Sequence, residues 1–154
     1  MKAFAQPTPS VPGADLGLRM HHVGYAVPNI SEYLSGYVSS MLRPRAVSPI
    51  IEDPIQRVRV VFVDLADGTL ELIEPIASDS PVQQILNRRR GGLYHVGYTT
   101  PHFDEAMAQA IADGCRALAK PVPATAFGRK RIVFFMTPHF DIIELIEMPE
   151  GETR

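Results

Sequence analysis

Two spacings of hydrophobic residues alternate along the chain and predict strands and helices. Apolar residues at every second position are typical of a strand with one buried face, and apolar residues three or four positions apart are typical of a helix. In the first part of the chain, the pattern predicts strands at 19–27, 46–51, 57–65 and 69–75, with a helix from Ser31 to Met41. In the second part, it predicts strands at 93–100, 115–119, 130–136 and 141–148, with a helix at 103–113. Ser80 and Pro81 are typical of a helix start, so a connecting helix of about ten residues is expected after them.

A repeat in the sequence explains why the two sets of elements match. The phrase His22-Val23-Gly24-Tyr25 returns as His95-Val96-Gly97-Tyr98, and Glu71-Leu72-Ile73-Glu74 returns as Glu144-Leu145-Ile146-Glu147. Both pairs are offset by the same 73 positions, and no gap is needed between them. An ungapped repeat of this kind indicates a duplicated module, here β-α-β-β-β. The predicted fold class is therefore α+β, with two tandem βαβββ modules.

The repeat also sets the expected domain limits. We expect a flexible tail at 1–17, a first module at 18–77, a linker helix within 78–92, a second module at 93–148 and a C-terminal end at 149–154. The two modules are expected to form one domain, because 154 residues are the usual size of a single compact unit.

Composition narrows the classes of function. Hydrophobic residues make up 45% of the chain, which is enough for a packed core, and the net charge of −2 comes without the basic stripe of a nucleic-acid-binding protein. No apolar run approaches the roughly 20 residues that span a bilayer. Cys115 is the single cysteine, so the chain cannot form an internal disulfide, which suits a reducing compartment. We therefore expect a cytoplasmic protein with a small-molecule partner and neither nucleic acid nor membrane. The basic run 88–90 is either a solvated linker or a contact for an anionic substrate tail.

The repeated phrases carry the candidate chemistry. On a strand, His22 shares a face with Gly24, and His95 shares a face with Gly97, so each imidazole has room beside it. A histidine from each opening strand and a glutamate from each closing strand would give two imidazoles and two carboxylates around a two-fold axis. This donor set suits Zn²⁺, Ni²⁺, Co²⁺, Mn²⁺ or Fe²⁺. One histidine on a strand would more often be structural, but two equivalent His/Glu pairs favour a metal site.

The motifs at 22–27, 71–75, 91–96 and 143–147 resemble those of the vicinal oxygen chelate superfamily, which includes glyoxalases, bleomycin resistance proteins and dioxygenases. Within it the chain is most similar to methylmalonyl-CoA epimerases, with glyoxalase I next, and the likeness covers 19–148. The resemblance implies a cupped mixed sheet around one divalent ion, Zn, Co, Ni or Mn. It implies four metal ligands, the first glutamate of each closing phrase among them: His22, Glu71, His95 and Glu144.

The resemblance further implies that a proton is removed from the carbon next to a carbonyl. The metal would bind the carbonyl oxygen and an adjacent oxygen and stabilise the enolate, while Glu144 accepts the proton. Epimerisation needs a second group to return the proton on the other face. The loop after the second strand matches the epimerase pattern at Gln56 and Val58 but not at Ile55, and Glu52 is the candidate for this second catalytic group, with Asp53 as an alternative.

Three other functions use the same features. A lactoylglutathione lyase of the glyoxalase I kind would need the same four ligands. A binding or resistance protein would hold a small molecule without chemistry, although such relatives tend to lack the ligands. A ring-cleaving dioxygenase would use two histidines and one glutamate on iron, which leaves Glu71 without a role. No organic cofactor site is expected, and a homodimer is expected from the resemblance.

Overall fold

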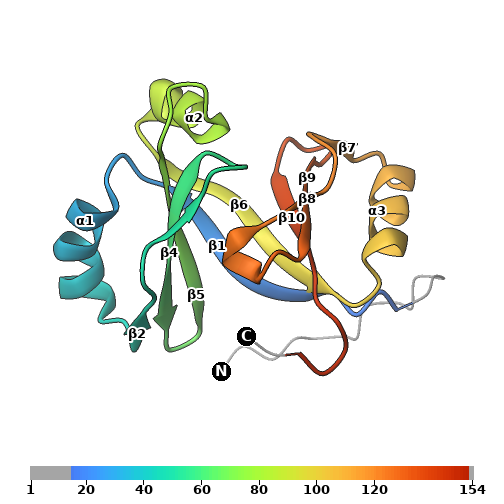
Figure 1. The fold of residues 1–154 in the computed structure, drawn as a ribbon, viewed down its shortest axis with the longest axis horizontal. Coiled ribbons are helices and arrows are strands. Elements are labelled where there is room, and N and C mark those ends of the chain that lie inside the picture. The colour runs from blue at the N-terminus through green and yellow to red at the C-terminus, as the bar shows by residue number, and fades with distance from the viewer. Residues whose placement is uncertain (1–14, 153–154) are drawn as a thin grey trace.

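Strands β1 (Arg19–Ala26) and β6 (Gly92–Thr100) lie antiparallel at the centre of one curved, ten-stranded sheet. The structure is a computed structural model and describes residues 15–152. Along the main path the strand order is β2-β4-β5-β1-β6-β10-β9-β7, while β3 pairs with β4 and β8 pairs with β9. The expected α+β class and the tandem arrangement of two modules are confirmed, since the first module supplies one half of this sheet and the second module the other (Figure 1).

The remaining elements follow in the same order in both modules. In the first module they are α1 (Ile30–Tyr33), η1 (Leu34–Leu42), β2 (Ala46–Val47), β3 (Ile51–Asp53), β4 (Val58–Leu65) and β5 (Gly68–Pro75). Helix α2 (Pro81–Arg89) connects the modules. In the second module they are α3 (Phe103–Ala112), β7 (Arg116–Ala117), β8 (Val122–Pro123), η2 (Thr125–Phe127), β9 (Arg131–Met136) and β10 (Ile142–Glu147). In each module the closing strand runs parallel to the opening strand, β5 beside β1 and β10 beside β6.

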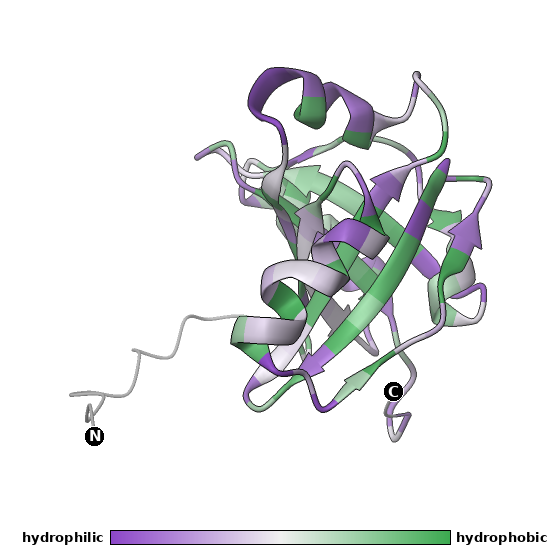
Figure 2. Cartoon of the chain, turned by 90° about the vertical axis from the view of Figure 1, so that its left-hand side faces the viewer, coloured by the Kyte–Doolittle hydropathy of each residue, from purple (hydrophilic) through white to green (hydrophobic). Residues whose placement is uncertain are grey.

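Hydrophobic residues are buried on both faces of the sheet. One cluster, which includes Phe62, Phe127 and Ile146, lies inside the curve of the sheet between the modules. A second packs α1 and η1 against β4 and β5, and a third packs α3 against β9 and β10. The outer helices therefore cover the two ends of the sheet, whereas the largely hydrophilic α2 covers little of it (Figures 1 and 2). Within residues 15–152, none of the helices combines the length and apolar character that crossing a membrane requires.

The structure corrects several local predictions. The first helix is capped by Asn29 and not by Ser31, because the Asn29 side chain accepts a hydrogen bond from the backbone N–H of Glu32 at 2.9 Å. That helix widens into the π-helical η1, whose backbone departs from helical angles at Gly36. The expected strand 46–51 is two short strands, and the loop after Lys120 contains β8 and η2, which the sequence did not predict. Most of the expected tail at 1–17 lies outside the described residues, and the other domain limits stay predictions.

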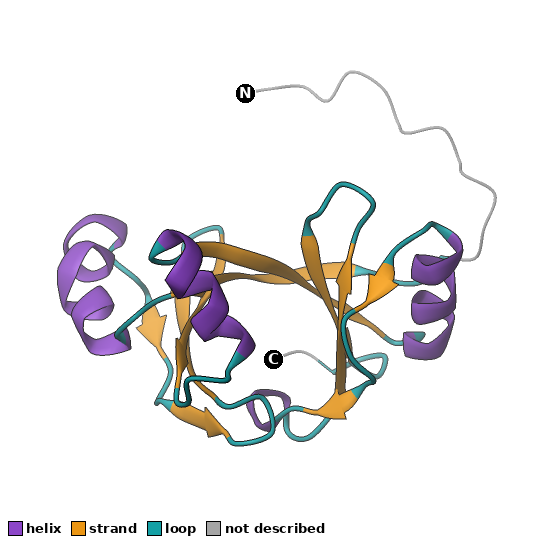
Figure 3. Ribbon diagram, turned by 90° about the horizontal axis from the view of Figure 1, so that it is seen from above, coloured by secondary structure: helices purple, strands orange, loops and turns teal. Residues whose placement is uncertain are grey.

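Asp53 of β3 joins the first module to η2 of the second module. Its buried carboxylate accepts hydrogen bonds from the backbone N–H groups of Ile55, Gln56 and Thr125, at 3.0, 2.9 and 2.8 Å. Thr125 belongs to η2 of the second module, so this bond joins residues 72 positions apart. Figure 3 shows β3 and η2 meeting where the curve of the sheet would otherwise stay open. Burial alone raises the pKa of Asp53, but these backbone N–H groups outweigh it and lower the pKa below its ordinary value.

Replacing Asp53 with alanine should lower the free energy of unfolding by about 3 kcal/mol, because buried backbone N–H groups lose their acceptor. Urea unfolding followed by circular dichroism measures this. The exposed Asp64 on β4 provides the matched control, and Asp64→Ala should change stability by less than about 0.5 kcal/mol. Because the folded pKa of Asp53 is lowered, its contribution is present above the ordinary value of 3.8 and is lost as the pH falls through the folded pKa. Equal stability of the two variants would contradict the role of Asp53.

Candidate metal centre

The strand register brings the four predicted ligands into two adjacent rows. In one row Glu71 of β5 lies beside Gly24 of β1, and Gly24 lies beside His95 of β6. In the other row His22 of β1 lies beside Gly97 of β6, and Gly97 lies beside Glu144 of β10. Each row therefore reads glutamate, glycine, histidine across three neighbouring strands, and the two rows run in opposite directions. The pseudo-two-fold axis expected from the repeat passes between them.

The two glycines are required because each lies under the imidazole of the other module. A Cβ atom added at Gly97 would lie 2.3 Å from Cε1 of His22, and one added at Gly24 would lie 2.3 Å from Cε1 of His95. No real Cβ atom tolerates such a distance, and the rings are held in a packed interior. The glycines of the repeated phrases therefore provide the space in which the two rings meet.

The donor atoms converge on one point. The Nε2 atoms of His22 and His95 lie 2.8 Å apart. Oε2 of Glu71 is 3.2 and 3.4 Å from these two nitrogen atoms, and Oε2 of Glu144 is 3.3 and 3.5 Å from them. One ligand atom from each of the four residues lies within 4.8 Å of all the others, and all four residues are buried. The structure thus brings together the four residues that the sequence singled out as metal ligands.

These distances fit a divalent cation. Nitrogen and oxygen ligands bind such ions at about 2.0–2.2 Å, so neighbouring donors are separated by about 2.8–3.6 Å, from octahedral to tetrahedral geometry. In addition, Oε2 of Glu144 is buried and has no hydrogen-bond partner among the described residues, although both imidazoles lie near it. Buried carboxylate oxygens are normally hydrogen-bonded or bound to a metal. The four side chains therefore form a cage for an ion better than they form a hydrogen-bonded cluster.

In the metal-free protein the two carboxylates favour the protonated form of both histidines. Burial alone lowers the pKa of His22, but the charges of Glu71 and Glu144 outweigh it and raise the pKa to about 10. The same opposition of burial and carboxylates raises the pKa of His95. For both carboxylates, burial acts to raise the pKa, but the histidines outweigh it and hold the pKa of Glu71 and of Glu144 below the ordinary value. A bound divalent ion would take over the positive charge that the two carboxylates attract.

A cavity of about 220 Å³ adjoins the cluster. It reaches Glu71, His95 and Glu144, and apolar side chains of β4, β9 and α2 line much of the rest. Its polar lining outside the cluster comes from Gln56, Arg57, Tyr94 and Lys120. Burial and the charges of Glu144 and Glu71 raise the pKa of Tyr94 to about 12, so its phenol keeps its proton at neutral pH. The cavity can hold a small carbonyl compound next to the four donors.

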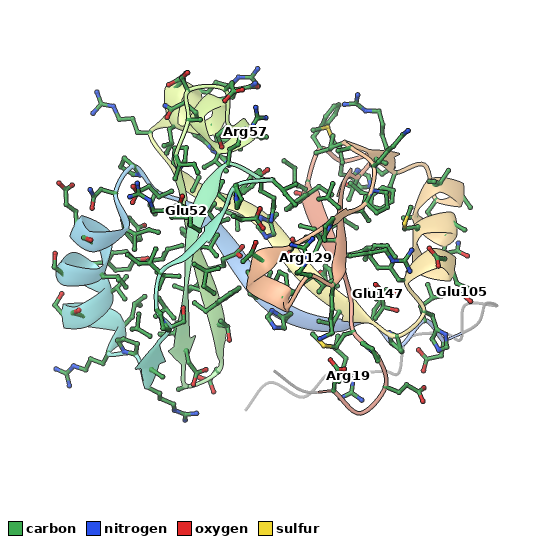
Figure 4. All side chains as sticks on the ribbon, in the orientation of Figure 1. Arg19, Glu52, Arg57, Glu105, Arg129 and Glu147 are labelled. Carbon is green, nitrogen blue, oxygen red and sulfur yellow. The ribbon has the colours of Figure 1, made fainter. Side chains whose placement is uncertain are left out.

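The structure places Glu52, the predicted second catalytic group, outside this cavity. Its side chain on β3 is 64% exposed and lies 3.8 Å from Arg59, and Figure 4 labels it beside β4. The alternative, Asp53, holds backbone N–H groups as described above. The second glutamates of the closing phrases are also engaged elsewhere, since Glu74 pairs with Arg59 and Glu147 pairs with Arg131.

Sequence reasoning missed two neighbours of the centre. His21, the residue before the repeated phrase, lies with its Nδ1 atom 2.9 Å from Nδ1 of His22. Phe127 of η2 stacks on the ring of His22 with centroids 6.0 Å apart. The ungapped repeat could have pointed to His21, because Tyr94 occupies the equivalent position beside His95. No pattern pointed to Phe127, because η2 is too short to have a recognisable period.

Comparisons with known proteins agree with this geometry. A family model described as the Glyoxalase/Bleomycin resistance protein/Dioxygenase superfamily matches residues 21–134. The mitochondrial methylmalonyl-CoA epimerase of Homo sapiens is 30% identical over 136 residues, which are 87% of this chain and 75% of that protein. An uncharacterised protein of Bacillus subtilis is also 30% identical over 136 residues, which are 87% of this chain and 94% of that protein. A variant of the Streptomyces coelicolor methylmalonyl-CoA epimerase, solved with 2-nitronate-propionyl-CoA, superposes with a TM-score of 0.71 at 26% identity, covering 84% of this chain and 96% of that one.

Replacing Gly97 with alanine should displace the His22 ring and lower the affinity for divalent ions by at least about 100-fold, and it should cost about 1–3 kcal/mol of stability. Gly68 is the matched control, because an added Cβ meets nothing within 4 Å there and its φ is not positive. Calorimetric titration with Zn²⁺ measures the affinity, and thermal unfolding measures the stability. Tight binding by Gly97→Ala would contradict the close packing of ring on glycine.

Uptake of a divalent ion should release at least about one proton at pH 7, because the raised pKa of His22 keeps it protonated and it must become neutral to bind the ion. The apparent affinity should therefore rise with pH until the pKa of about 10 of His22 is passed. Titration calorimetry in two buffers with different ionisation enthalpies counts the protons, and binding without proton release would contradict the charge state described. In the metal-free protein, the raised pKa of His22 contributes stability that is fully present below its ordinary value of 6.5 and is lost as the pH rises through about 10.

Proposed function

We propose that this chain, which belongs to the glyoxalase/bleomycin resistance protein/dioxygenase superfamily, is a divalent-metal-dependent epimerase. Its reaction is the removal and return of a proton next to the carbonyl of methylmalonyl-CoA or a related acyl-CoA. Relatives named methylmalonyl-CoA epimerase support this reaction, one of them 30% identical in sequence and another, of known structure, 26% identical. The chain's own residues support it through one observation above all: two histidines and two glutamates converge beside a cavity.

The donor set supports Zn²⁺, Co²⁺, Ni²⁺ or Mn²⁺ as the ion, held by His22, Glu71, His95 and Glu144. When bound, such an ion supplies the positive charge that stabilises an enolate next to the reacting carbon. Apolar residues of the cavity, such as Val60 and Ile73, exclude water from this point. Tyr94 can donate a hydrogen bond to a substrate oxygen, because its phenol remains protonated.

Glu144 is the proposed base. It lines the cavity, its Oε2 atom has no hydrogen-bond partner among the described residues, and its lowered pKa keeps it ionised and able to accept a proton at neutral pH. Its equivalent in the first module, Glu71, lines the same cavity from β5. In the sheet order these two carboxylates flank the pair β1–β6 from opposite sides.

Two residues are candidates for the group that returns the proton. Glu52 is proposed from the family resemblance and would have to leave Arg59 and turn toward the cavity to act. Glu71 needs no such movement, because it already lines the cavity. A comparison of Glu52→Gln with Glu71→Gln separates them when each variant is saturated with the metal ion, since Glu71 is also a proposed ligand. Loss of the returning group then lowers net epimerisation while Glu144 still exchanges the proton on its own face.

The reaction is tested by incubating the metal-loaded protein with methylmalonyl-CoA in D₂O and following deuterium uptake at the α-carbon by NMR. Wild-type protein should exchange the proton, and Glu144→Gln should do so about 10²–10⁴-fold more slowly because a general base is lost. Glu147→Gln is the matched control, because Glu147 is the second glutamate of the same phrase and pairs with Arg131. Activity found solely with the glutathione hemiacetal of a 2-oxoaldehyde would assign the chain to the lactoylglutathione lyases instead. Binding of methylmalonyl-CoA or of the hemiacetal without turnover of either compound would favour a protein that only sequesters a small molecule.

The family resemblance also leads us to propose a homodimer in the cytoplasm. Sedimentation velocity at micromolar concentration tests the dimer, and a monomer under these conditions would contradict it.

A further inference from the structure

The two central strands each carry a register shift at the residue that precedes the ligand histidine. On β1 the pairing passes from Met20 to His22 and skips His21, and on β6 it passes from His95 to Leu93 and skips Tyr94. A residue in such a bulge is re-aimed relative to the alternation of the strand. His21 and Tyr94 are also 73 positions apart, so they are equivalent positions of the repeat, and each precedes a candidate ligand histidine.

In the first module this position contacts the ligand directly. Nδ1 of His21 lies 2.9 Å from Nδ1 of His22, and the two rings meet edge to face with centroids 5.2 Å apart. The ring of His21 packs against Phe127 and Phe62, with centroid distances of 5.4 and 6.1 Å. Two aromatic side chains from different modules thus fix the orientation of His21.

In the second module the equivalent residue, Tyr94, also meets its ligand histidine edge to face, with ring centroids 5.0 Å apart. The ring of Tyr94 stacks on Phe134 with centroids 6.0 Å apart and lines the cavity. Nδ1 of His95 is buried and has no hydrogen-bond partner among residues 15–152. The two ligand histidines are therefore equivalent in position but differ in the support of their second nitrogen atom.

We propose that His21 is a positioning residue for the metal ligand His22. Because Nε2 of His22 faces the other donors, its proton must lie on Nδ1 when an ion is bound, and the Nδ1 atom of His21 accepts that proton in a hydrogen bond. This contact fixes both the tautomer and the ring plane of His22, as the partners of metal-bound histidines generally do. The inference rests on the metal centre of the proposed function and does not depend on which reaction that centre performs.

A consequence is that the metal centre is asymmetric. The ring of His22 is held by His21 before an ion binds. Nδ1 of His95 has no such partner within the described part of the chain. The metal should be held more strongly by the first module than by the second, in spite of the symmetric set of ligands.

Three variants separate the hydrogen bond from the packing of the ring. His21→Phe keeps an aromatic ring against Phe62 and Phe127 but removes the acceptor. His21→Asn loses the ring but keeps an oxygen atom near the place of Nδ1. His139→Ala removes an exposed histidine at the turn before β10 and controls for the general effect of losing a histidine.

The measurements are the affinity for Co²⁺, from competition with a chelator, and the visible absorption spectrum of the Co²⁺-loaded protein, which reports ligand geometry. His21→Phe should bind about 10–100-fold more weakly and change the spectrum. His21→Asn should stay within about threefold of the wild type, and His139→Ala should equal it. Thermal unfolding of the metal-free variants verifies that each is folded.

Each remaining outcome overturns a defined statement. Tight binding and an unchanged spectrum for His21→Phe would overturn the positioning role alone. Weak binding by a folded His21→Asn, together with tight binding by His21→Phe, would assign His21 to packing instead. Absence of Co²⁺ binding in the wild type would overturn the metal centre of the proposed function and the positioning role with it.

Discussion

The structure depends on the close packing of two imidazole rings on two glycines across the pair β1–β6. The antiparallel register sets His22 beside Gly97 and His95 beside Gly24. A side chain on either glycine would occupy the space of a ring. The same register aligns Glu71 and Glu144 on the flanking parallel strands. A shift of either central strand by one residue would turn its side chains to the opposite face. The pairing that joins the two modules therefore also brings the four candidate ligands together.

Burial of four ionisable groups makes this arrangement costly unless their charges cancel. An isolated buried charge is strongly unfavourable, and the removal of one partner from a buried pair leaves the other uncompensated. Protonation of the histidines offsets the charge of the carboxylates in the metal-free state, which is why the pKa of His22 is raised and that of Glu71 is lowered. A divalent ion would offset the same charge when the histidines are neutral.

The sequence predicted those features that depend on one strand or on the repeat. The offset of 73 positions identified the modules, the central strands and two equivalent His/Glu pairs, because the same local pattern was written twice. The family resemblance then selected the first glutamate of each phrase as the predicted ligand. It did not reveal that each glycine serves the histidine of the other module, because that depends on the register between distant strands. Ser31 was wrongly expected to cap the first helix, because Asn29 competes two residues earlier. The family phrase at 52–58 indicated a catalytic glutamate, but strand pairing turns Glu52 toward Arg59 and leaves Asp53 to join the modules.

The two modules have kept their ligands alike and have changed what surrounds them. On the side of His22, His21, Phe62 and Phe127 close the space around the ring, and His22 is fully buried. On the side of His95, Tyr94 packs against both His95 and Phe134, and the cavity reaches the cluster. This cavity thus meets the four donors through His95, Glu71 and Glu144 and not through His22. The cavity reaches both Glu71 and Glu144 from this one side, so a single bound molecule can meet both carboxylates of the pseudo-symmetric pair.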